Sequence, residues 1–332
     1  MAPKNKNPYE RKDCFINMMG FVAIIGLLCL FHSPHCGTLA ESTYACDNLP
    51  ILQKGATRAG PPHIQLARRD KRPSGEFDDD NITGQYAVWQ TTVGKYYGLQ
   101  AKIGVWAHPN QVHLQESGAS IAVNNAKRGS SFSTLQAGFH VLPDLYNNSD
   151  VHFFTYWTRD RYGSTGCYNL RCSGFVPADG VVLVLGKAVG PPYDGEDRYI
   201  TISLHTDPNT GNWLLYRKDL EKSLFLGHFP KELCPELNDG APRAAFIGFV
   251  SYPKNGTTPA MGSGHFPEEG ERRATYFKNM TLFDSNAKPH DPIPSIMVPL
   301  MSKRDYYRIS DIPLGTKDGY MFYYGGPEGC SG

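Results

Sequence analysis

Two adjacent carboxylates in a glycine-rich stretch are the residues best suited to chemistry in this sequence. Residues 261–270 read MGSGHFPEEG and contain Glu268, Glu269 and a nearby histidine, His265. A carboxylate can serve as a general base or acid when its environment tunes it. If the stretch is extended, the two-residue period places Ser263, His265 and Glu269 on one face and Glu268 on the other. Only one glutamate could then face a cleft, and an exposed turn holding both remains the alternative.

Other catalytic and metal-binding patterns are missing from the sequence. It has no G-x-S-x-G, no HExxH, no C-x-x-C and no Walker loop, and its eleven histidines are scattered without ligand spacing. We therefore expect no metal site and no cofactor. Cys167 and Cys172 are separated by four residues, a spacing that predicts a short-loop disulfide rather than a redox centre.

The elements that would position these residues are short β-strands. Runs rich in Val, Ile, Thr, Tyr, Phe and Trp recur between clusters of Gly, Pro, Asn and Asp, and no long helical period is present. This pattern of short strand-like runs and turn residues predicts an all-β domain over residues 85–332, an antiparallel β-sandwich of two sheets. The expected strand segments are 85–93, 99–106, 119–124, 151–157, 181–189, 198–206, 212–218, 244–252, 274–283 and 320–324.

The N-terminus has the pattern of a targeting segment. Four basic residues precede an apolar run over 15–31, and small residues follow it. We expect a signal peptide within residues 1–40 and a secreted protein. The alternative is a signal anchor, because the run is close to the length that spans a bilayer, and a membrane partner is expected only in that case.

The segment between the leader and the domain is polar. Residues 41–84 alternate basic, proline-containing and acidic blocks, which predicts a short pro-segment or linker. It contains two dibasic pairs, Arg68-Arg69 and Lys71-Arg72, which are either processing sites or part of a solvated charged loop.

Sequons and cysteines agree with secretion. Four N-glycosylation sequons predict glycans on Asn81, Asn147, Asn255 and Asn279. The chain has eight cysteines, of which Cys14, Cys29 and Cys36 fall in or beside the leader. In an oxidising compartment most of the remaining five should pair, so either one thiol is free or Cys46 is removed with a processed segment.

The net charge excludes one class of partner. Lys and Arg number 33 and Asp and Glu number 32, which leaves a formal charge of +1. Nucleic-acid-binding domains usually carry a clustered basic excess, so no nucleic acid is expected as a partner.

Four motifs of the sequence are long and specific: FFTYWTRDRYGSTGCYNLRCSGFV (153–176), MGSGHFPEEG, ATYFKNM (274–280) and FYYGGPEGC (322–330). Together they give the chain a resemblance to the plant neprosin family of secreted glutamic peptidases. It extends in order through YYGLQAKIGVW, STLQAGFHVLPDLY and GNWL, and it covers about residues 85–332.

The resemblance implies a β-sandwich with an open cleft, in which a carboxylate pair cleaves a peptide or protein substrate after proline at acidic pH. One catalytic glutamate is carried over to Glu269. The other belongs in a stretch that reads STLQAGF here, so Gln136 stands in the glutamate position and Phe139 in a tryptophan position. The fungal glutamic peptidases of the scytalidoglutamic type are similar and use a glutamine–glutamate pair. In that arrangement Glu269 would be general base and then acid, and Gln136 the oxyanion donor.

Two further departures concern the segment 41–84 and the C-terminus. The segment is short for the family's activation region. The family usually has a cysteine that would pair with Cys330, but residues 304–309 contain only tyrosines at that place, so Cys234 becomes the candidate partner.

Three function classes follow. The first is a secreted glutamic endopeptidase acting through Glu269 and Gln136. The second is a catalytically inactive β-sandwich that binds a cell-wall polymer or a peptide. The third is a glycoside hydrolase, which would need Asp144 or Glu268 as a second carboxylate and therefore ranks last. The sequence predicts neither the natural substrate nor the oligomeric state.

Overall fold

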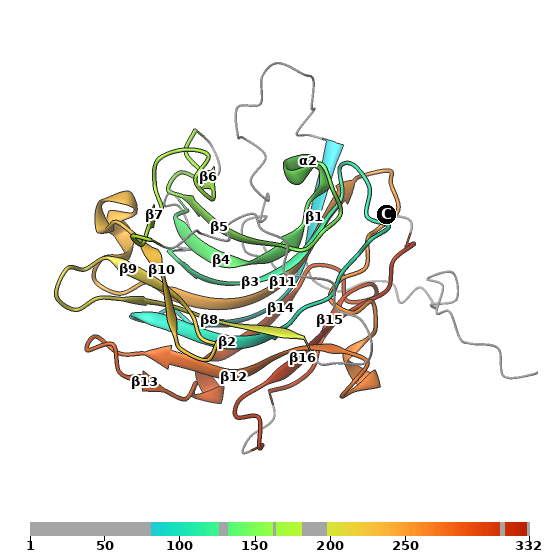
Figure 1. Cartoon of the computed structure of the whole chain (residues 1–332). Coiled ribbons are helices and arrows are strands. Elements are labelled where there is room, and N and C mark those ends of the chain that lie inside the picture. The colour runs from blue at the N-terminus through green and yellow to red at the C-terminus, as the bar shows by residue number, and fades with distance from the viewer. Residues whose placement is uncertain (1–80, 126–131, 162–163, 181–197, 313–315, 331–332) are drawn as a thin grey trace, which may run out of the picture. The chain divides into compact units, whose positions relative to one another are not determined.

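The computed structural model describes residues 81–125, 132–161, 164–180, 198–312 and 316–330. They form two antiparallel sheets packed face to face, as predicted (Figure 1). The seven-stranded sheet has, in spatial order, β14 (Met297–Met301), β1 (Ile82–Thr91), β11 (Arg243–Pro253), β3 (Glu116–Asn124), β4 (Thr134–Val141), β5 (His152–Thr158) and β6 (Cys167–Tyr168).

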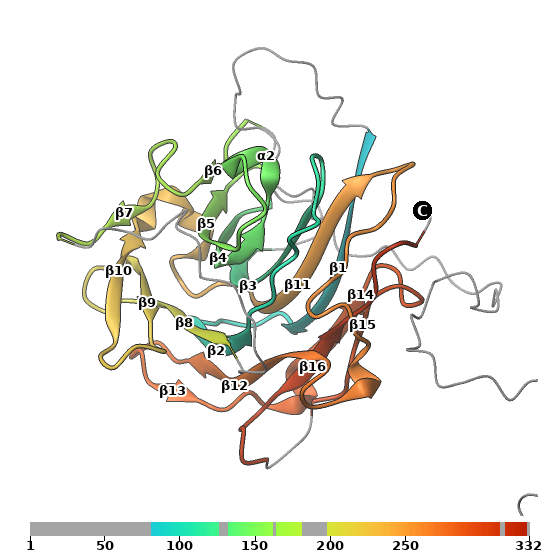
Figure 2. The ribbon, with the colours of Figure 1, turned by 45° about the vertical axis from the view of Figure 1, so that its right-hand side comes forward.

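The second sheet has nine strands. In order they are β15 (Arg308–Ile309), β16 (Phe322–Gly325), β12 (Thr275–Phe283), β2 (Gly98–Gly104), β8 (Tyr199–Thr206), β9 (Trp213–Arg217), β10 (Leu224–Phe229) and β7 (Val176–Pro177), and β13 (Pro289–His290) pairs with β12. Figure 2 shows that the seven-stranded sheet is curved, with one face turned towards the other sheet and the opposite face concave.

Helices in the described part of the chain are short. They are α2 (Pro143–Tyr146) and the 3-10 turns η3 (Lys231–Leu233), η4 (Pro235–Leu237), η5 (Pro267–Glu269) and η6 (Pro294–Ile296). This agrees with the missing helical period in the sequence. The strand expected over 181–189 lies outside the described residues.

The core between the sheets is built from aromatic rings. Phe246 of β11 lies 6.0 Å, centroid to centroid, from Phe277 of β12, which stacks on Phe322 of β16 at 4.9 Å. All three side chains are fully buried, and each contributes about 1.5–3 kcal/mol through burial. Gly248 of β11 faces Tyr324 of β16, and a Cβ at Gly248 would lie 2.3 Å from that ring. The close approach of the two sheets at this point therefore requires glycine.

The cysteines confirm one prediction and correct another. Cys167 and Cys172 form the predicted disulfide, with their Cα atoms 5.9 Å apart. The pairing of Cys234 with Cys330 is wrong, because Cys234 is a free, buried thiol while Cys330 is in a disulfide. Cys234 lies between η3 and η4, where its Sγ contacts the carbonyl oxygen of Thr158 on β5, and burial raises its pKa to about 12. Cys330 is held instead by Thr258.

The four sequon asparagines, Asn81, Asn147, Asn255 and Asn279, all lie in the described residues, and all are exposed. Their glycosylation stays a prediction. The N-terminal leader and the segment up to residue 80 lie outside the described residues, so the predictions for them also remain predictions.

Candidate functional site

Gln136 lies on the concave face of the seven-stranded sheet. Successive residues of β4 point to opposite faces, and Leu135, Ala137 and Phe139 belong to the core between the sheets. Gln136 therefore points away from that core. Its Nε2 donates to the Oγ of Ser120 on β3 over 2.7 Å, and the residue is only 5% exposed. Its amide is thus already bonded within the fold.

The side chains beside Gln136 on this face carry no carboxylate. Its neighbours in register are Tyr156 on β5, Ala122 on β3 and, across β3, Ala245 on β11. Gly138 comes next along β4, opposite Ser120, and a Cβ there would lie 2.0 Å from a backbone oxygen of β3. The first carboxylate along the same face of β3 is six residues from Ala122, at Glu116, roughly 20 Å away at about 3.4 Å per residue.

Glu269 lies in a different environment. The stretch that was expected to be extended contains the 3-10 turn η5, so the strand-alternation argument for residues 263–269 is wrong. Glu269 follows His265 by four residues, and the turn brings the two side chains together, with the Nδ1 of His265 2.9 Å from the carboxylate Oε2. Phe266 donates its backbone N–H to Oε1 over 3.0 Å, and Arg273 donates to Oε2 over 3.1 Å. Both carboxylate oxygens are used to hold the turn.

The side chains of Glu268 and Glu269 differ in exposure, as expected from the sequence, although the cause is not strand alternation. The side chain of Glu269 is 18% exposed, whereas that of Glu268 is 64% exposed and meets only Arg308, at 3.5 Å. The turn, rather than strand alternation, separates them.

The structure does not bring Gln136 and Glu269 together through any shared contact. η5 lies in the connection between β11 and β12 and contacts β16 of the nine-stranded sheet. Gln136 lies on the face of the other sheet that points away from the core. No hydrogen bond or ion pair joins the two side chains in the described residues, and their bonding partners are different.

This arrangement predicts a structural role for Glu269. Replacing Glu269 with alanine should lower the free energy of unfolding by about 0.5–2 kcal/mol, since it removes the acceptor for the backbone N–H of Phe266. Glu268→Ala is the matched control and should change it by less than about 0.5 kcal/mol. Urea unfolding of both variants checks this. Equal stabilities for the two variants would contradict it.

A series of hydrogen bonds between buried polar side chains lies on the concave face. It was not predicted from the sequence. His140 of β4 is fully buried, with its Nδ1 2.8 Å from Oε1 of Glu116 and its Nε2 2.9 Å from the hydroxyl of Tyr146 on α2. Asn169 donates to the same hydroxyl over 3.2 Å. Two-residue spacing on β4 places His140 on the same face as Gln136, but nothing in the sequence indicated the partners.

One arrangement of protons gives each of these hydrogen bonds a donor and an acceptor. Asn169 donates to Tyr146, the Tyr146 hydroxyl donates to Nε2 of His140, and the Nδ1–H of His140 donates to Glu116. Burial raises the pKa of Tyr146, which keeps its proton in place as a donor. The chain of bonds fixes α2 against the sheet.

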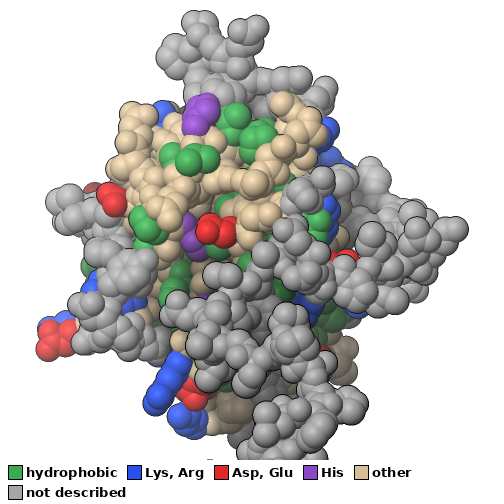
Figure 3. All heavy atoms as spheres, turned by 90° about the vertical axis from the view of Figure 1, so that its right-hand side faces the viewer, with side chains coloured by type: hydrophobic (Ala, Val, Ile, Leu, Met, Phe, Trp, Pro, Cys, Tyr) green, Lys and Arg blue, Asp and Glu red, His purple; other side chains and the backbone are tan. Residues whose placement is uncertain are grey.

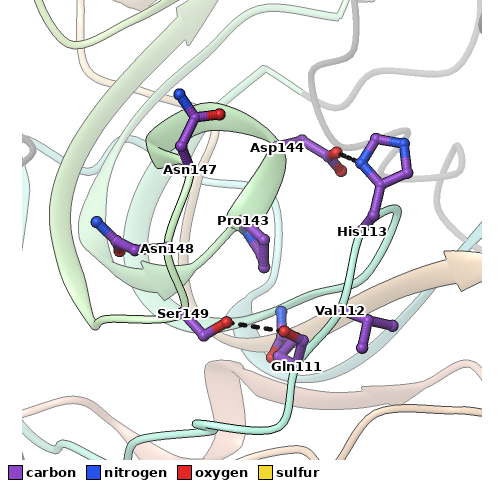
Figure 4. Close-up of a pocket in the computed structure, with 8 residues that line it drawn as sticks. All are labelled: Gln111, Val112, His113, Pro143, Asp144, Asn147, Asn148 and Ser149. Atoms are coloured by element: carbon purple, nitrogen blue, oxygen red, sulfur yellow. Dashed lines mark hydrogen bonds and ion pairs between the residues drawn. The ribbon is translucent and has the colours of Figure 1, made fainter.

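Beside α2 lies an open pocket of about 500 Å³, shown in Figure 4. His113 pairs with Asp144 at one side of it, and Ser149 donates to the backbone oxygen of Gln111 at the other. Gln111 is 6% exposed and donates to the carbonyl of Val141, while its Oε1 has no partner among the described residues. The full lining is Gln111, Val112, His113, Pro143, Asp144, Asn147, Asn148 and Ser149.

The pocket lining is suited to amide-bearing ligands. Three residues with side-chain amides line it, and Val112 and Pro143 add apolar side chains. Figure 3 faces the side of the molecule on the right of Figure 1, where hydrophobic side chains lie among backbone and other side chains, acidic and histidine side chains are visible near the centre, and basic side chains lie towards the margins.

Among the residues that the structure describes, no group of three or more His, Cys, Asp or Glu side chains is placed to hold a metal ion. No helix among the same residues has the length and apolar character needed to cross a bilayer.

Comparison with known proteins gives one family and several distant structures. The sequence model of the Neprosin family matches residues 113–327. Among solved structures, scytalido-glutamic peptidase with a peptide-based transition-state analogue is 8% identical at a TM-score of 0.39, covering 74% of this chain and 99% of that one. SCP-B, a member of the eqolisin family of peptidases in complex with the tripeptide Ala-Ile-His, is 7% identical at a TM-score of 0.37, covering 73% and 98%. At this similarity, residue roles cannot be transferred from either peptidase.

Proposed function

The chain belongs to the neprosin family, and from this premise we propose that it is a peptide-binding β-sandwich that does not hydrolyse its ligand through Gln136 and Glu269. The observation that carries the proposal is the separation of these two residues, each already bonded within its own part of the fold. A glutamic peptidase needs a carboxylate beside the amide, so that one water can lie between them.

Hydrolysis by a glutamine–glutamate pair needs both side chains at the same substrate. The carboxylate must take a proton from the attacking water, and the amide N–H must stabilise the negative oxygen that forms on the substrate. Gln136 has its amide on Ser120, and its neighbours Ala122 and Ala245 offer no base. The first step therefore lacks a carboxylate among the register neighbours of the Gln136 amide.

The pocket beside α2 is the proposed binding site. The side-chain amides of its lining residues are suited to the N–H and C=O groups of an extended peptide. Val112 and Pro143 supply an apolar contact that suits a proline or another apolar side chain.

The second candidate is the secreted endopeptidase predicted from the sequence. The observation in its favour is membership of a family that the motifs MGSGHFPEEG and STLQAGF associate with glutamic peptidases. In this case the chain would cleave peptides after proline at acidic pH, with Glu269 as the base and Gln136 as the oxyanion donor.

One experiment separates the two candidates. The secreted full chain is incubated with a proline-containing peptide library between about pH 3 and 7, beside the variants Gln136→Glu and Glu269→Gln. We expect no cleavage by any of the three. Cleavage by the parent chain that disappears in Glu269→Gln without loss of folding would overturn the proposal and support the endopeptidase.

Binding is measured on the same peptides. Val112→Glu adds a charge to the pocket wall and is expected to weaken peptide binding at least tenfold, as measured by fluorescence anisotropy. Val93→Glu is the matched control, because Val93 is 59% exposed and Val112 57% exposed, but Val93 lies outside the pocket. Equal affinities for the two variants would place the binding site elsewhere.

A further inference from the structure

The strands of the nine-stranded sheet carry basic side chains and no acidic ones. Among the described residues, none of these strands contains Asp or Glu, although they contain Lys102, Lys278, Arg217 and Arg308. The carboxylates nearest to them in the sequence lie in the connecting loops. A surface of this kind is electrostatically complementary to a negatively charged partner.

Strand alternation determines which side chains face away from the other sheet. The core between the sheets takes every second residue of β2 and of β8. Lys102 on β2 and Tyr199, Thr201 and His205 on β8 therefore point to the outer face of the nine-stranded sheet. Tyr199 is 40% exposed and the other three are half-buried, so all four are accessible from this side.

A lysine and two tyrosine rings lie at one end of this outer face. Nζ of Lys102 lies 3.6 Å from the ring centroid of Tyr199 and 5.7 Å from that of Tyr276 on β12. Lys278 stands directly opposite Lys102 in register and pairs with Asp318 at 3.0 Å. Lys278 is buried, so Lys102 is the more accessible of the two ammonium groups at this end.

A second lysine lies beside a stack of rings at the other end. The His205 ring is parallel to within 8° to that of Tyr216 on β9, at 5.4 Å, and to within 15° to that of Phe283 on β12, at 4.6 Å. Nζ of Lys218, an exposed residue, lies 5.9 Å from the Phe283 ring. This end therefore repeats the combination of an ammonium group with aromatic rings.

The distance between the two ends indicates the size of the ligand. Lys102 is opposite Thr201 of β8, and the ring stack is centred on His205, four residues further along, which is roughly 14 Å at about 3.4 Å per residue. Gln100 and Thr201 offer an amide and a hydroxyl group between them. A small anion would contact only one end, whereas an extended polymer with repeated negative charges would contact both.

We propose that this face binds a polysaccharide that carries carboxylate groups. The carboxylates would pair with Lys102 and Lys218, and the C–H faces of the sugar rings would pack on Tyr199 and on the ring stack. The hydroxyl groups would bond to Gln100 and Thr201. None of these residues lines the pocket beside α2, so the inference does not depend on the proposed function.

Two other polyanionic partners fit this face less well. A lipid surface requires apolar side chains that protrude into it, whereas the rings at the second end are stacked against one another. A nucleic acid requires a larger basic excess than a chain of net charge +1 provides.

Binding to polygalacturonate tests the proposal. The full secreted chain is applied to immobilised polygalacturonate at about pH 6, where its carboxylates are ionised, and to the fully methyl-esterified polymer, which is the neutral match. We expect binding to the acidic form only, and weaker binding as salt is added. Equal binding to both forms, or binding to neither, overturns the proposal.

Variants locate the site on the protein. The double variant Lys102→Gln/Lys218→Gln is expected to bind polygalacturonate at least about fivefold more weakly, because it loses both ammonium groups. Tyr199→Ala should also weaken binding, whereas Tyr199→Phe, which keeps the ring, should not. Lys254→Gln is the matched control, since Lys254 is an exposed lysine in the turn after β11 of the other sheet. Unchanged binding by the double variant, or an equal loss in Lys254→Gln, overturns the proposal.

The competing partners are measured with the same proteins. Vesicles containing an anionic phospholipid and a single-stranded RNA are titrated beside polygalacturonate, and circular dichroism confirms that each variant is folded. We expect polygalacturonate to bind most tightly. Tighter binding of the vesicles or of the RNA, lost in the double variant, would overturn the proposal and assign the face to that partner instead.

Discussion

Replacing His140 with leucine is expected to lower the free energy of unfolding by about 3–5 kcal/mol. The substitution keeps an apolar side chain beside Phe154, on which the His140 ring stacks at 4.3 Å, but it removes the donor 2.8 Å from Glu116. Glu116 is 3% exposed, and its other oxygen has only a 3.4 Å contact with Ser251. A buried carboxylate is then left largely uncompensated. Urea unfolding near pH 7 measures the loss.

A double-mutant cycle separates this cause from loss of packing. In the variant Glu116→Leu/His140→Leu the carboxylate is gone together with its hydrogen-bond donor, and replacing both partners of a buried hydrogen bond by apolar groups can be nearly neutral in stability. We expect the double variant to recover most of the stability that His140→Leu loses. If the double variant is less stable than His140→Leu, packing rather than the buried charge accounts for the effect.

Acidification from pH 6.5 to pH 4 is expected to destabilise the fold by on the order of 1–3 kcal/mol through two half-buried histidines, His108 and His205. Burial lowers the pKa of His108 to about 4, against the opposing effect of its hydrogen bond to the backbone of Gly262. Burial, together with the nearby Lys218, lowers the pKa of His205 to about 4, and the His205 ring stacks on Phe283 at 4.6 Å.

The direction in which stability changes with pH follows from proton uptake by the folded and unfolded chains. In the unfolded chain both histidines take up a proton near pH 6.5, whereas in the folded chain they do so only near pH 4. Their contribution to stability is therefore complete above about pH 6.5, falls as the pH drops through this window, and is gone below about pH 4.

Unfolding in urea at several pH values tests this second prediction. The variants His108→Gln and His205→Gln should flatten the slope of stability against pH between 6.5 and 4, while His290→Gln, at an exposed position, should leave it unchanged. Parallel slopes for all four proteins would show that other groups control the acid response. An acid-working enzyme would have to tolerate this loss.

The fold class was predictable from the sequence because most strands are rich in β-branched and aromatic residues. The segment 244–252, for example, coincides with β11, and 198–206 contains β8. β4 was not among the expected strands. Its residues, TLQAGFHV, include glutamine, alanine and glycine, which have low β-propensity. β4 is a central strand buried on both faces, where tertiary packing determines the conformation.

The site was only partly predictable, for a related reason. The sequence and the resemblance identified Gln136 and Glu269, and their individual environments could not be derived from spacing. Pro267 at the start of η5 favours a turn, and this signal was available in the sequence. The two hydrogen-bond partners of His140 come from two other segments, Glu116 from β3 and Tyr146 from α2, so these hydrogen bonds exist only after folding.

The bonding of Glu269 has a consequence for sorting related sequences. A carboxylate that caps its own turn would be kept by selection for folding, whatever happens to catalysis. The motif MGSGHFPEEG would therefore persist in sequences that cleave peptides and in sequences that do not. A search for active relatives should instead ask which side chains stand beside the position of Gln136, on the strands equivalent to β3, β5 and β11, because these strands carry its neighbours in register.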